Sequence, residues 1–196
     1  MHNLFAEQLK EGAMGATTGI EKLESLKDYL DGLTERAGVK ELRYHLESLD
    51  VTIDDVAEFV RFKQDGYQRN LVHEGPLYQL LVMCWLSGQR SPIHNHAEST
   101  CGVRVLSGVA TETRFAMTPS NLFKPVKSFD HEAESVSVSQ DSDTHQISNL
   151  QEEGNNLVTL HIYSPPLLRM DTYSLTDSVV GEYRPMVVGC IEGDGI

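Results

Sequence analysis

The segment SPIHNHAESTCG, residues 91–102, contains two histidines one residue apart and a cysteine five residues after the second of them. On a β-strand, the spacing of His94 and His96 directs both imidazoles to the same face of the sheet. If that face is the interior of a barrel, two nitrogen ligands converge on one point, and imidazole suits first-row transition metals. A metal site is therefore one interpretation of this segment, and a pair of structural histidines is the other.

Helical periodicity extends over the N-terminal third of the chain. A capping box formed by Thr18 and Glu21 precedes a stretch that runs toward Gly38 and has one apolar face. The residues of that face are Ile20, Leu23, Leu26, Leu30 and Leu33. Two shorter stripes follow: the first is Leu42, Leu46 and Leu49, and the second, in a segment that starts at Thr52, is Val56, Phe59 and Val60. We predict helices within residues 1–64.

After about Asp65 the pattern changes to short β-branched and aromatic runs separated by Gly, Pro, Asn, Asp and Ser. The runs are LYQLLVMCW, CGVRVLSGVATETRFAM, SVSVSQ and LVTLHIYS. Strands this numerous must close into a barrel or sandwich to avoid long exposed edges. We predict a mainly β protein with antiparallel strands and a C-terminal tail in 65–196, and the length of 196 residues favours one domain over 1–196.

Composition excludes several classes of partner. The formal net charge is −13, from 29 acidic and 16 basic residues, so we expect neither nucleic acid nor an anionic membrane to bind. The opening segment MHNLFAEQLKEG lacks a basic region and a long apolar run, and we expect a cytoplasmic protein. Three cysteines, Cys84, Cys101 and Cys190, form no CxxC pair, which argues against a disulfide framework or a zinc site built from thiolates.

Spacing around the two histidines resembles the motifs of the cupin superfamily, which are small β-barrels with an interior metal. Gly88 and Gly108 flank the first motif, and THQISN supplies His145 for the second. This resemblance implies a cupin-type antiparallel β-barrel and makes His94, His96 and His145 the metal ligands. Cys101 stands where most cupins have a glutamate ligand, and QDSDTH lacks the usual Pro-x-Gly. Three neutral imidazoles leave a divalent iron with its full charge and three open positions, which suits an anionic, chelating substrate.

Among cupins, the chain resembles the cysteine dioxygenases over nearly its whole length. GYQRNLV is similar to the segment in which a tyrosine and an arginine flank the substrate, which assigns Tyr67 and Arg69. Cys101 occupies the position of a cysteine that becomes thioether-linked to a tyrosine, supplied by TLHIYSPP as Tyr163. In that segment Thr159, His161 and Tyr163 alternate and share a face, which fits the family's Ser-His-Tyr relay with Thr in place of Ser.

The resemblance implies that the protein oxidises L-cysteine with dioxygen to cysteine sulfinate at Fe(II). In that role Arg69 grips the substrate carboxylate through its planar fork, helped by the hydroxyls of Tyr163 and Tyr67. Tyr163, oriented by His161 and restrained by Cys101, positions or protonates an oxygen intermediate. Met170 stands where mammalian enzymes have a further cysteine, so that thiol is absent. We expect a monomer.

Alternatives stay open at this point. Arg69 could be a surface cation, although the YxRN context favours the clamp, and Cys101 could be an inert buried side chain. His161 and Tyr163 could be core aromatics. His131, in FDHEAESVS, is expected in a solvated acidic loop without a strand partner.

For function, the alternatives are a dioxygenase of 3-mercaptopropionate or another small thiol, a non-catalytic cupin that binds a metal or ligand, and a metal-free structural barrel. Relatives that act on 3-mercaptopropionate place a glutamine at the position of Arg69, so the arginine favours cysteine.

Overall fold

Helices lie at the N-terminal end of the described chain. The computed structural model describes residues 19–141 and 144–189. It contains the helices α1 (Gly19–Asp31) and α2 (Val39–Glu47) and the short 3-10 helix η1 (Asp54–Phe59). These segments confirm the predicted helical N-terminus, with two differences: the first helix ends at Asp31, and the third segment is a 3-10 helix with a kink at Val56. Thr18 of the predicted capping box and Cys190 lie outside the described residues.

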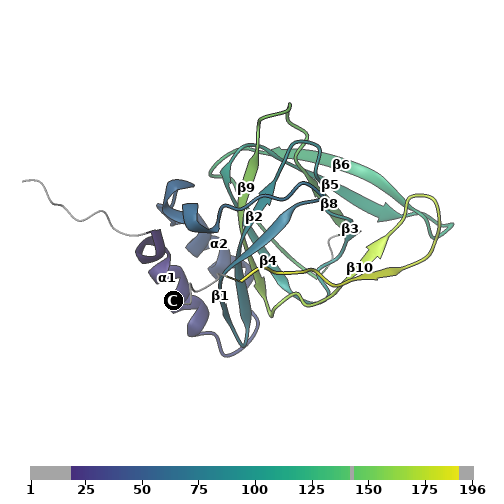
Figure 1. Cartoon of the computed structure of the whole chain (residues 1–196). Helices are drawn as coiled ribbons and strands as arrows, with labels where there is room; N and C mark the ends of the chain where they lie inside the picture. Colours follow the sequence, from purple (N-terminus) through teal and green to yellow (C-terminus); the bar gives the residue numbers. More distant parts are fainter. Residues whose placement is uncertain (1–18, 142–143, 190–196) are drawn as a thin grey trace, which may run out of the picture.

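The strands form two antiparallel sheets that face each other (Figure 1). The five-stranded sheet has the order β1-β2-β9-β4-β7, and the six-stranded sheet has the order β11-β10-β3-β8-β5-β6. The strands of the first sheet are β1 (Gln68–Gly75), β2 (Tyr78–Trp85), β9 (Leu157–Ser164), β4 (Thr100–Ser107) and β7 (Val136–Gln140). Those of the second are β11 (Gly181–Tyr183), β10 (Met170–Tyr173), β3 (Ile93–His94), β8 (His145–Ser148), β5 (Ala110–Met117) and β6 (Phe123–His131). The predicted mainly β, cupin-type barrel with an N-terminal helical segment is confirmed.

Strands β2 and β9 are buried on both faces, which explains their continuous apolar sequences. Along β2, Leu80, Val82 and Cys84 contact the helices on the outer side of the five-stranded sheet. The alternate positions Leu81, Met83 and Trp85 belong to a second core inside the barrel. Burying each such aliphatic side chain stabilises the fold by about 1.5–3 kcal/mol. Cys84 is fully buried in the core between this sheet and the helices.

Helix α2 packs closely against β4 at Gly102. A side-chain carbon at this position would lie 2.8 Å from Leu46 and 2.9 Å from Leu42, closer than carbon atoms normally approach. Both leucines are fully buried, as the predicted stripe requires. The absence of a side chain at Gly102 therefore lets the helix cover the outer face of the strand that carries Cys101.

The N-terminal elements are also joined by polar contacts around Asp55. Its carboxylate accepts hydrogen bonds from the backbone N–H of Thr52, at 2.8 Å, and from Lys22 Nζ in α1, at 3.0 Å. These contacts lower the pKa of Asp55 to about 2. The carboxylate thus satisfies a free donor just before η1 and ties η1 to α1.

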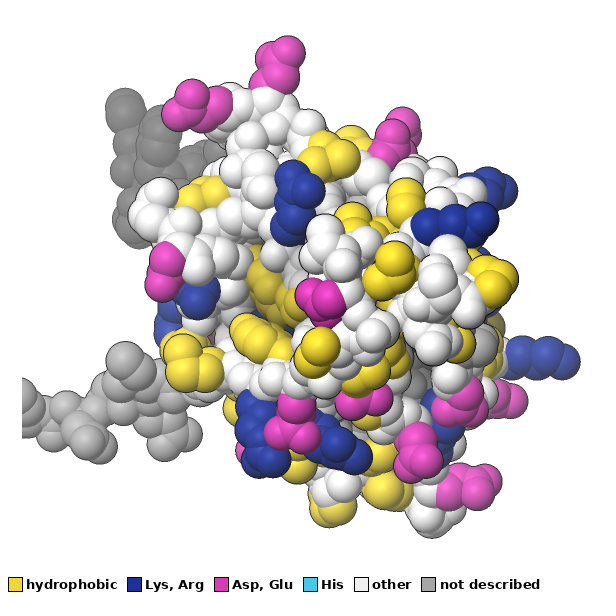
Figure 2. All heavy atoms as spheres, turned by 90° about the vertical axis from the view of Figure 1, so that its right-hand side faces the viewer, with side chains coloured by type: hydrophobic (Ala, Val, Ile, Leu, Met, Phe, Trp, Pro, Cys, Tyr) yellow, Lys and Arg dark blue, Asp and Glu magenta, His cyan; other side chains and the backbone are white. Residues whose placement is uncertain are grey.

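The face opposite the helices is mixed in character. Figure 2 shows apolar side chains scattered among acidic and basic ones, and no histidine of the described residues is visible on this face. Within the described residues, no helix is long and apolar enough to cross a membrane.

Candidate metal centre and adjoining cavity

Three buried histidines meet inside the barrel. His94 on β3 and His145 on β8 are directly opposed partners in neighbouring antiparallel strands, and their ring centroids are 4.8 Å apart. His96 follows β3, and its Nε2 lies 3.1 Å from Nε2 of His145. One nitrogen of each imidazole lies within 4.8 Å of the other two, and none of the three histidines is more than 5% exposed. The cluster can hold a metal ion.

His96 reaches the cluster from a turn, whereas the sequence argument placed both histidines on one strand. Strand β3 ends at His94, and the chain reverses through Ala97 and Glu98, whose φ angles are 44° and 73°. The N–H of Ser99 donates to the carbonyl of His96 at 2.9 Å and closes this turn. The two imidazoles do converge, as the i, i+2 spacing predicts. They converge because of a strained turn, and not because both residues lie on one strand.

Hydrogen bonds donated by the outer ring nitrogens leave Nε2 without a proton in two of the neutral histidine rings. His94 Nδ1 donates to the carbonyl of Pro92 at 2.9 Å, and His145 Nδ1 donates to Glu112 Oε1 at 3.0 Å. Burial, together with the neighbouring His145, lowers the pKa of His94 to about 3 and that of His96 well below its usual range. These two imidazoles are therefore neutral at ordinary pH, the state in which they bind metals.

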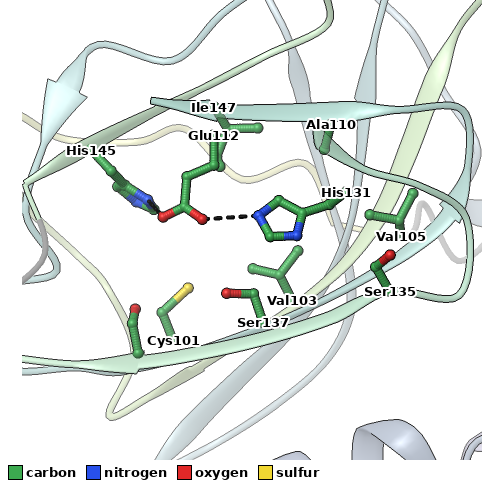
Figure 3. A pocket seen from close by; sticks show the side chains of 11 residues that line it. Cys101, Val103, Val105, Ala110, Glu112, His131, Ser135, Ser137, His145 and Ile147 are labelled. Atoms are coloured by element: carbon green, nitrogen blue, oxygen red, sulfur yellow. Dashed lines mark hydrogen bonds and ion pairs between the residues drawn. The ribbon is translucent and has the colours of Figure 1, made fainter. Parts of the chain in front are cut away.

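Glu112 on β5 contacts the histidine cluster and is not among the residues predicted from the sequence. Its side chain is 3% exposed, and its two oxygens accept from His145 Nδ1 and from His131 Nε2, both at 3.0 Å (Figure 3). Burial alone would raise the pKa of Glu112, but these two hydrogen bonds outweigh it and hold the pKa below its usual range. A carboxylate on the far side of a ligand histidine fixes the ring orientation and increases ligand basicity.

His131 lies on a strand, contrary to the prediction from the sequence. It is the last residue of β6, paired with Ala110 of β5, and its side chain is 26% exposed. The predicted solvated loop without a strand partner is therefore wrong. Strand β6 is an edge strand with mostly exposed side chains and a proline, so its sequence lacks the alternation by which buried strands are recognised.

A cavity surrounds the contact between Glu112 and His131. It is lined from both sheets and reaches the thiol of Cys101 and the ring of His145 (Figure 3). Ser135, Ser137 and Ser139 form its polar side. Cys101, His145 and Ile147 also line the neighbouring cavity that contains Arg69, and they therefore separate the two cavities.

Every predicted site residue lines one small cavity, which we call the site cavity. Its walls include Tyr67, Arg69, His94, His96, Cys101, His145, His161 and Tyr163. Four further residues complete the lining, namely Met83, Trp85, Ser91 and Ile147. Residues 67 to 163 thus converge from both sheets, which spacing in the sequence alone does not show.

Arg69 on β1 is buried in the site cavity, so the alternative of a surface cation is excluded. The side chain is 3% exposed, and its guanidinium carbon lies 5.0 Å from the ring centroid of Tyr163. Nε and Nη2 have no hydrogen-bond partner among the described residues. A buried cation with unused donors is costly unless a ligand completes its hydrogen bonds, and a carboxylate matches its fork.

Polar side chains on the inner face of β9 form a connected chain. Thr159 Oγ1 lies 2.9 Å from His161 Nε2, and His161 Nδ1 lies 3.3 Å from the hydroxyl of Tyr163. Burial and the charge of Arg69 lower the pKa of His161, while burial raises the pKa of Tyr163. The imidazole is neutral and the phenol protonated at ordinary pH, as a proton-donating phenol requires.

Cys101 and Tyr163 occupy directly opposed positions in β4 and β9, and both are nearly completely buried. Opposed residues in an antiparallel pair have their Cβ atoms about 4.5–5.5 Å apart. The two side chains are therefore cross-strand neighbours inside the barrel. Met170, on β10, is 1% exposed and packs in the same inner core.

Comparisons of the sequence with known proteins point to one family. The family model described as cysteine dioxygenase type I matches residues 11–176. Cysteine dioxygenase type 1 of Danio rerio is 30% identical over 166 residues, covering 80% of this chain and 82% of the relative. The Homo sapiens protein of the same name is 29% identical over 136 residues, covering 67% and 68%.

Solved structures with a similar fold include two cupin-like proteins. A Klebsiella pneumoniae protein with a double-stranded β-helix domain has 19% identity and a TM-score of 0.44, covering 56% of this chain and 86% of its own. An RmlC-like cupin protein from Desulfovibrio desulfuricans has 23% identity and a TM-score of 0.40, covering 55% and 90%. Neither bears on function.

Proposed function

The chain belongs to the cysteine dioxygenase type I family, and from this premise we propose that it oxidises L-cysteine with dioxygen to cysteine sulfinate. The observation that supports this substrate most directly is the buried guanidinium of Arg69, which has two unused donors and shares the site cavity with the three histidines. A thiol that also carries a carboxylate reaches both groups.

The three-histidine cluster fits a ferrous ion. His94 and His145 direct Nδ1 to oxygen acceptors and keep Nε2 for a metal, and the two neutral imidazoles of His94 and His96 add no charge of their own. Imidazole ligands suit iron among the first-row metals, and the family assignment favours iron. When bound, the ferrous ion supplies the redox chemistry that dioxygen needs to react with a thiol.

Binding of the amino acid depends on the opposite wall of the site cavity. Arg69 binds the substrate carboxylate with Nε and Nη2, which removes the cost of leaving these donors unpaired. Burial raises the pKa of both Tyr67 and Tyr163, so their hydroxyls remain protonated and can donate to the same carboxylate or to oxygen. Holding the thiol beside the metal makes oxygen transfer effectively intramolecular.

The pair Cys101 and Tyr163 forms a thioether during turnover in this proposal. A bond forms between the sulfur and a ring carbon, while the thiol hydrogen and one ring hydrogen leave as two protons. The two electrons released reduce dioxygen to hydrogen peroxide. Their opposed positions on β4 and β9 support the pairing, and the bond would restrict the rotation of the phenol.

Oxygen consumption by the iron-loaded protein tests the substrate. We expect uptake to be fastest with L-cysteine and slower with 3-mercaptopropionate and cysteamine, because only cysteine has both the carboxylate for Arg69 and the α-amino group. Fastest uptake with 3-mercaptopropionate would replace cysteine by the alternative substrate. Iron-containing protein that consumes no oxygen with any of the three thiols would instead indicate a non-catalytic cupin.

A further inference from the structure

Strand β1, which carries Arg69, lies at the edge of the five-stranded sheet, and part of its free edge is covered by the end of the described chain. Val188 forms a parallel bridge with Asn70. Its N–H donates to the carbonyl of Arg69, and its carbonyl accepts from the N–H of Leu71, both at 2.9 Å. These two bonds occupy backbone groups that an edge strand otherwise leaves unpaired, and they hold the backbone of Arg69 from outside the sheet.

The other end of this C-terminal segment (residues 181–188) belongs to the six-stranded sheet. Gly181 lies on β11 and pairs with Thr172 of β10, and Thr172 pairs on its other side with His94. Figure 1 shows the C-terminal segment as the yellow chain that crosses from β10 to β1. The segment therefore starts two strands away from a histidine of the cluster and ends beside Arg69, so it links the edges of the two sheets.

Side chains of the C-terminal segment also lie beside residues of the site cavity. Val187 is partly buried and packs against the inner core, as Tyr67 and Leu71 do. Burial raises the pKa of Tyr67, and the neighbouring hydroxyl of Tyr183 adds to this shift against the charge of Arg69. The segment thus supports the carboxylate end of the site cavity through both its backbone and its side chains.

A small thiol acid requires a fixed distance between its two binding groups. In cysteine, covalent geometry sets the separation of the sulfur and the carboxylate, and homocysteine lengthens it by one methylene. In the proposed function the sulfur binds beside the histidine cluster and the carboxylate binds Arg69, two groups that come from different sheets. A misplacement of about 1 Å at such a site can cost roughly a hundredfold in rate. A link between the two sheets therefore influences which thiol fits.

We propose that the C-terminal segment is a positioning element that sets the spacing between Arg69 and the histidine cluster, and thereby selects thiols of the length of cysteine. The selection of length rests on the proposed function, whereas the pairing of Val188 with β1 does not. The family model ends its match at residue 176, so the segment lies outside the matched region.

Amide hydrogen exchange tests the link itself in the full-length protein loaded with zinc, a diamagnetic ion. The N–H of Leu71 should be protected in the unmodified protein, because it donates to Val188. Val188→Pro removes the N–H that donates to Arg69, so the link opens more often and exchange at Leu71 should become at least about tenfold faster. Val188→Ala keeps the N–H and is the matched control. Fast exchange at Leu71 in the unmodified protein, or equal protection in the two variants, would overturn the proposal.

Anaerobic calorimetry tests the selection of length, because it measures binding to the iron-loaded protein without turnover. One methylene changes affinity by about 10–200-fold in a fitted site, so L-cysteine should bind at least about tenfold more tightly than L-homocysteine. In Val188→Pro this ratio should fall toward one, mainly because cysteine binds more weakly, and in Val188→Ala it should persist. A ratio near one in the unmodified protein, or the same ratio in both variants, would contradict the proposal, since a general loss of packing weakens both thiols alike.

Val187→Ala gives a second test if Val188→Pro does not fold. It keeps the backbone bonds but removes part of the contact with the inner core, so the ratio should fall in the same direction by a smaller factor. Met186→Ala, at a neighbouring side chain that is 78% exposed, is the control. Equal ratios for these two variants would count against the proposal. If the ratios behave as expected but the unmodified protein consumes no oxygen with cysteine, the proposed function fails while the positioning role stands.

Discussion

The two sheets contribute different chemistry to the same cavity. The six-stranded sheet and the turn after β3 provide the three histidines, supported from behind by Glu112. The five-stranded sheet provides Arg69 from β1, Trp85 from β2, Cys101 from β4, and His161 and Tyr163 from β9. In the proposed function, the six-stranded sheet with the turn after β3 is thus the metal side, and the five-stranded sheet is the substrate side.

The sides also differ in how completely their polar groups are paired. On the metal side, both oxygens of Glu112 accept hydrogen bonds from histidines. On the substrate side, Arg69 keeps two buried donors without partners among the described residues. Buried polar groups are normally satisfied, and each exception costs about 1–3 kcal/mol or more when charged. This difference fits the proposed function, in which the histidines are already oriented for an ion and the donors of Arg69 are paired when the substrate binds.

The largest effect is expected from His145→Ala. This substitution removes one of three imidazoles and leaves Glu112 without its buried partner, so we expect almost complete loss of iron after purification. Elemental analysis measures it, and circular dichroism checks that the fold is kept. His73→Ala is the control, because His73 contacts Tyr78 on the other side of β1 and does not line the site cavity. Iron content equal to that of the unmodified protein would refute the assignment of the metal side.

Arg69→Ala removes the proposed carboxylate clamp and leaves the three histidines in place. Charge-assisted hydrogen bonds contribute about 1.5–3 kcal/mol each, so loss of the two bonds of the clamp should raise KM for cysteine by at least about a hundredfold. Iron content should stay unchanged, because Arg69 belongs to the other sheet. Arg90→Ala, at an exposed position, is the control for loss of a positive charge. If KM for cysteine does not change, the carboxylate binds elsewhere.

Glu112→Gln changes the metal side without removing a histidine. Glutamine keeps an oxygen acceptor but loses the charge, so we expect iron affinity to fall by 10–100-fold, the usual effect of changing an outer partner of a ligand histidine. Competition with a chelator measures the affinity, and KM for cysteine should change little. Glu132→Gln, at an exposed position nearby, is the control. Equal affinities for both variants would leave Glu112 with a purely structural role.

The smallest effect is expected from Cys101→Ser. Intact mass spectrometry after turnover should show the unmodified protein short by two hydrogens and the variant at full mass. We expect only a few-fold lower activity, because Tyr163 keeps its contact with His161. A full mass for the unmodified protein after many turnovers would remove the thioether from the account.

Much of this architecture is readable from the sequence, because local patterns encode it. Alternation and apolar runs predict β2, β4, β5 and β9, and the leucine stripes predict α1 and α2. The three histidines and Arg69 are found through motif spacing and family resemblance. Each of these signals lies within a short segment of chain.

The missed residues depend on pairings between distant segments. Glu112 lies in ATETRF at an inward position shared with Ala110, a signal that could have placed its carboxylate inside the barrel. Its partners His131 and His145 are set by the pairing of β5 with β6 and β8, which no local pattern gives. Likewise, the contact of Trp85 with Thr159 arises only when β2 lies beside β9.

Isotope labelling tests the central claim, that a metal side and a substrate side jointly oxidise the thiol of cysteine. The iron-loaded protein is incubated with L-cysteine under ¹⁸O₂, and the sulfur product is identified by mass spectrometry. We predict cysteine sulfinate with both sulfinate oxygens labelled. Formation of cystine alone, or of sulfinate with oxygen from water, would contradict the account.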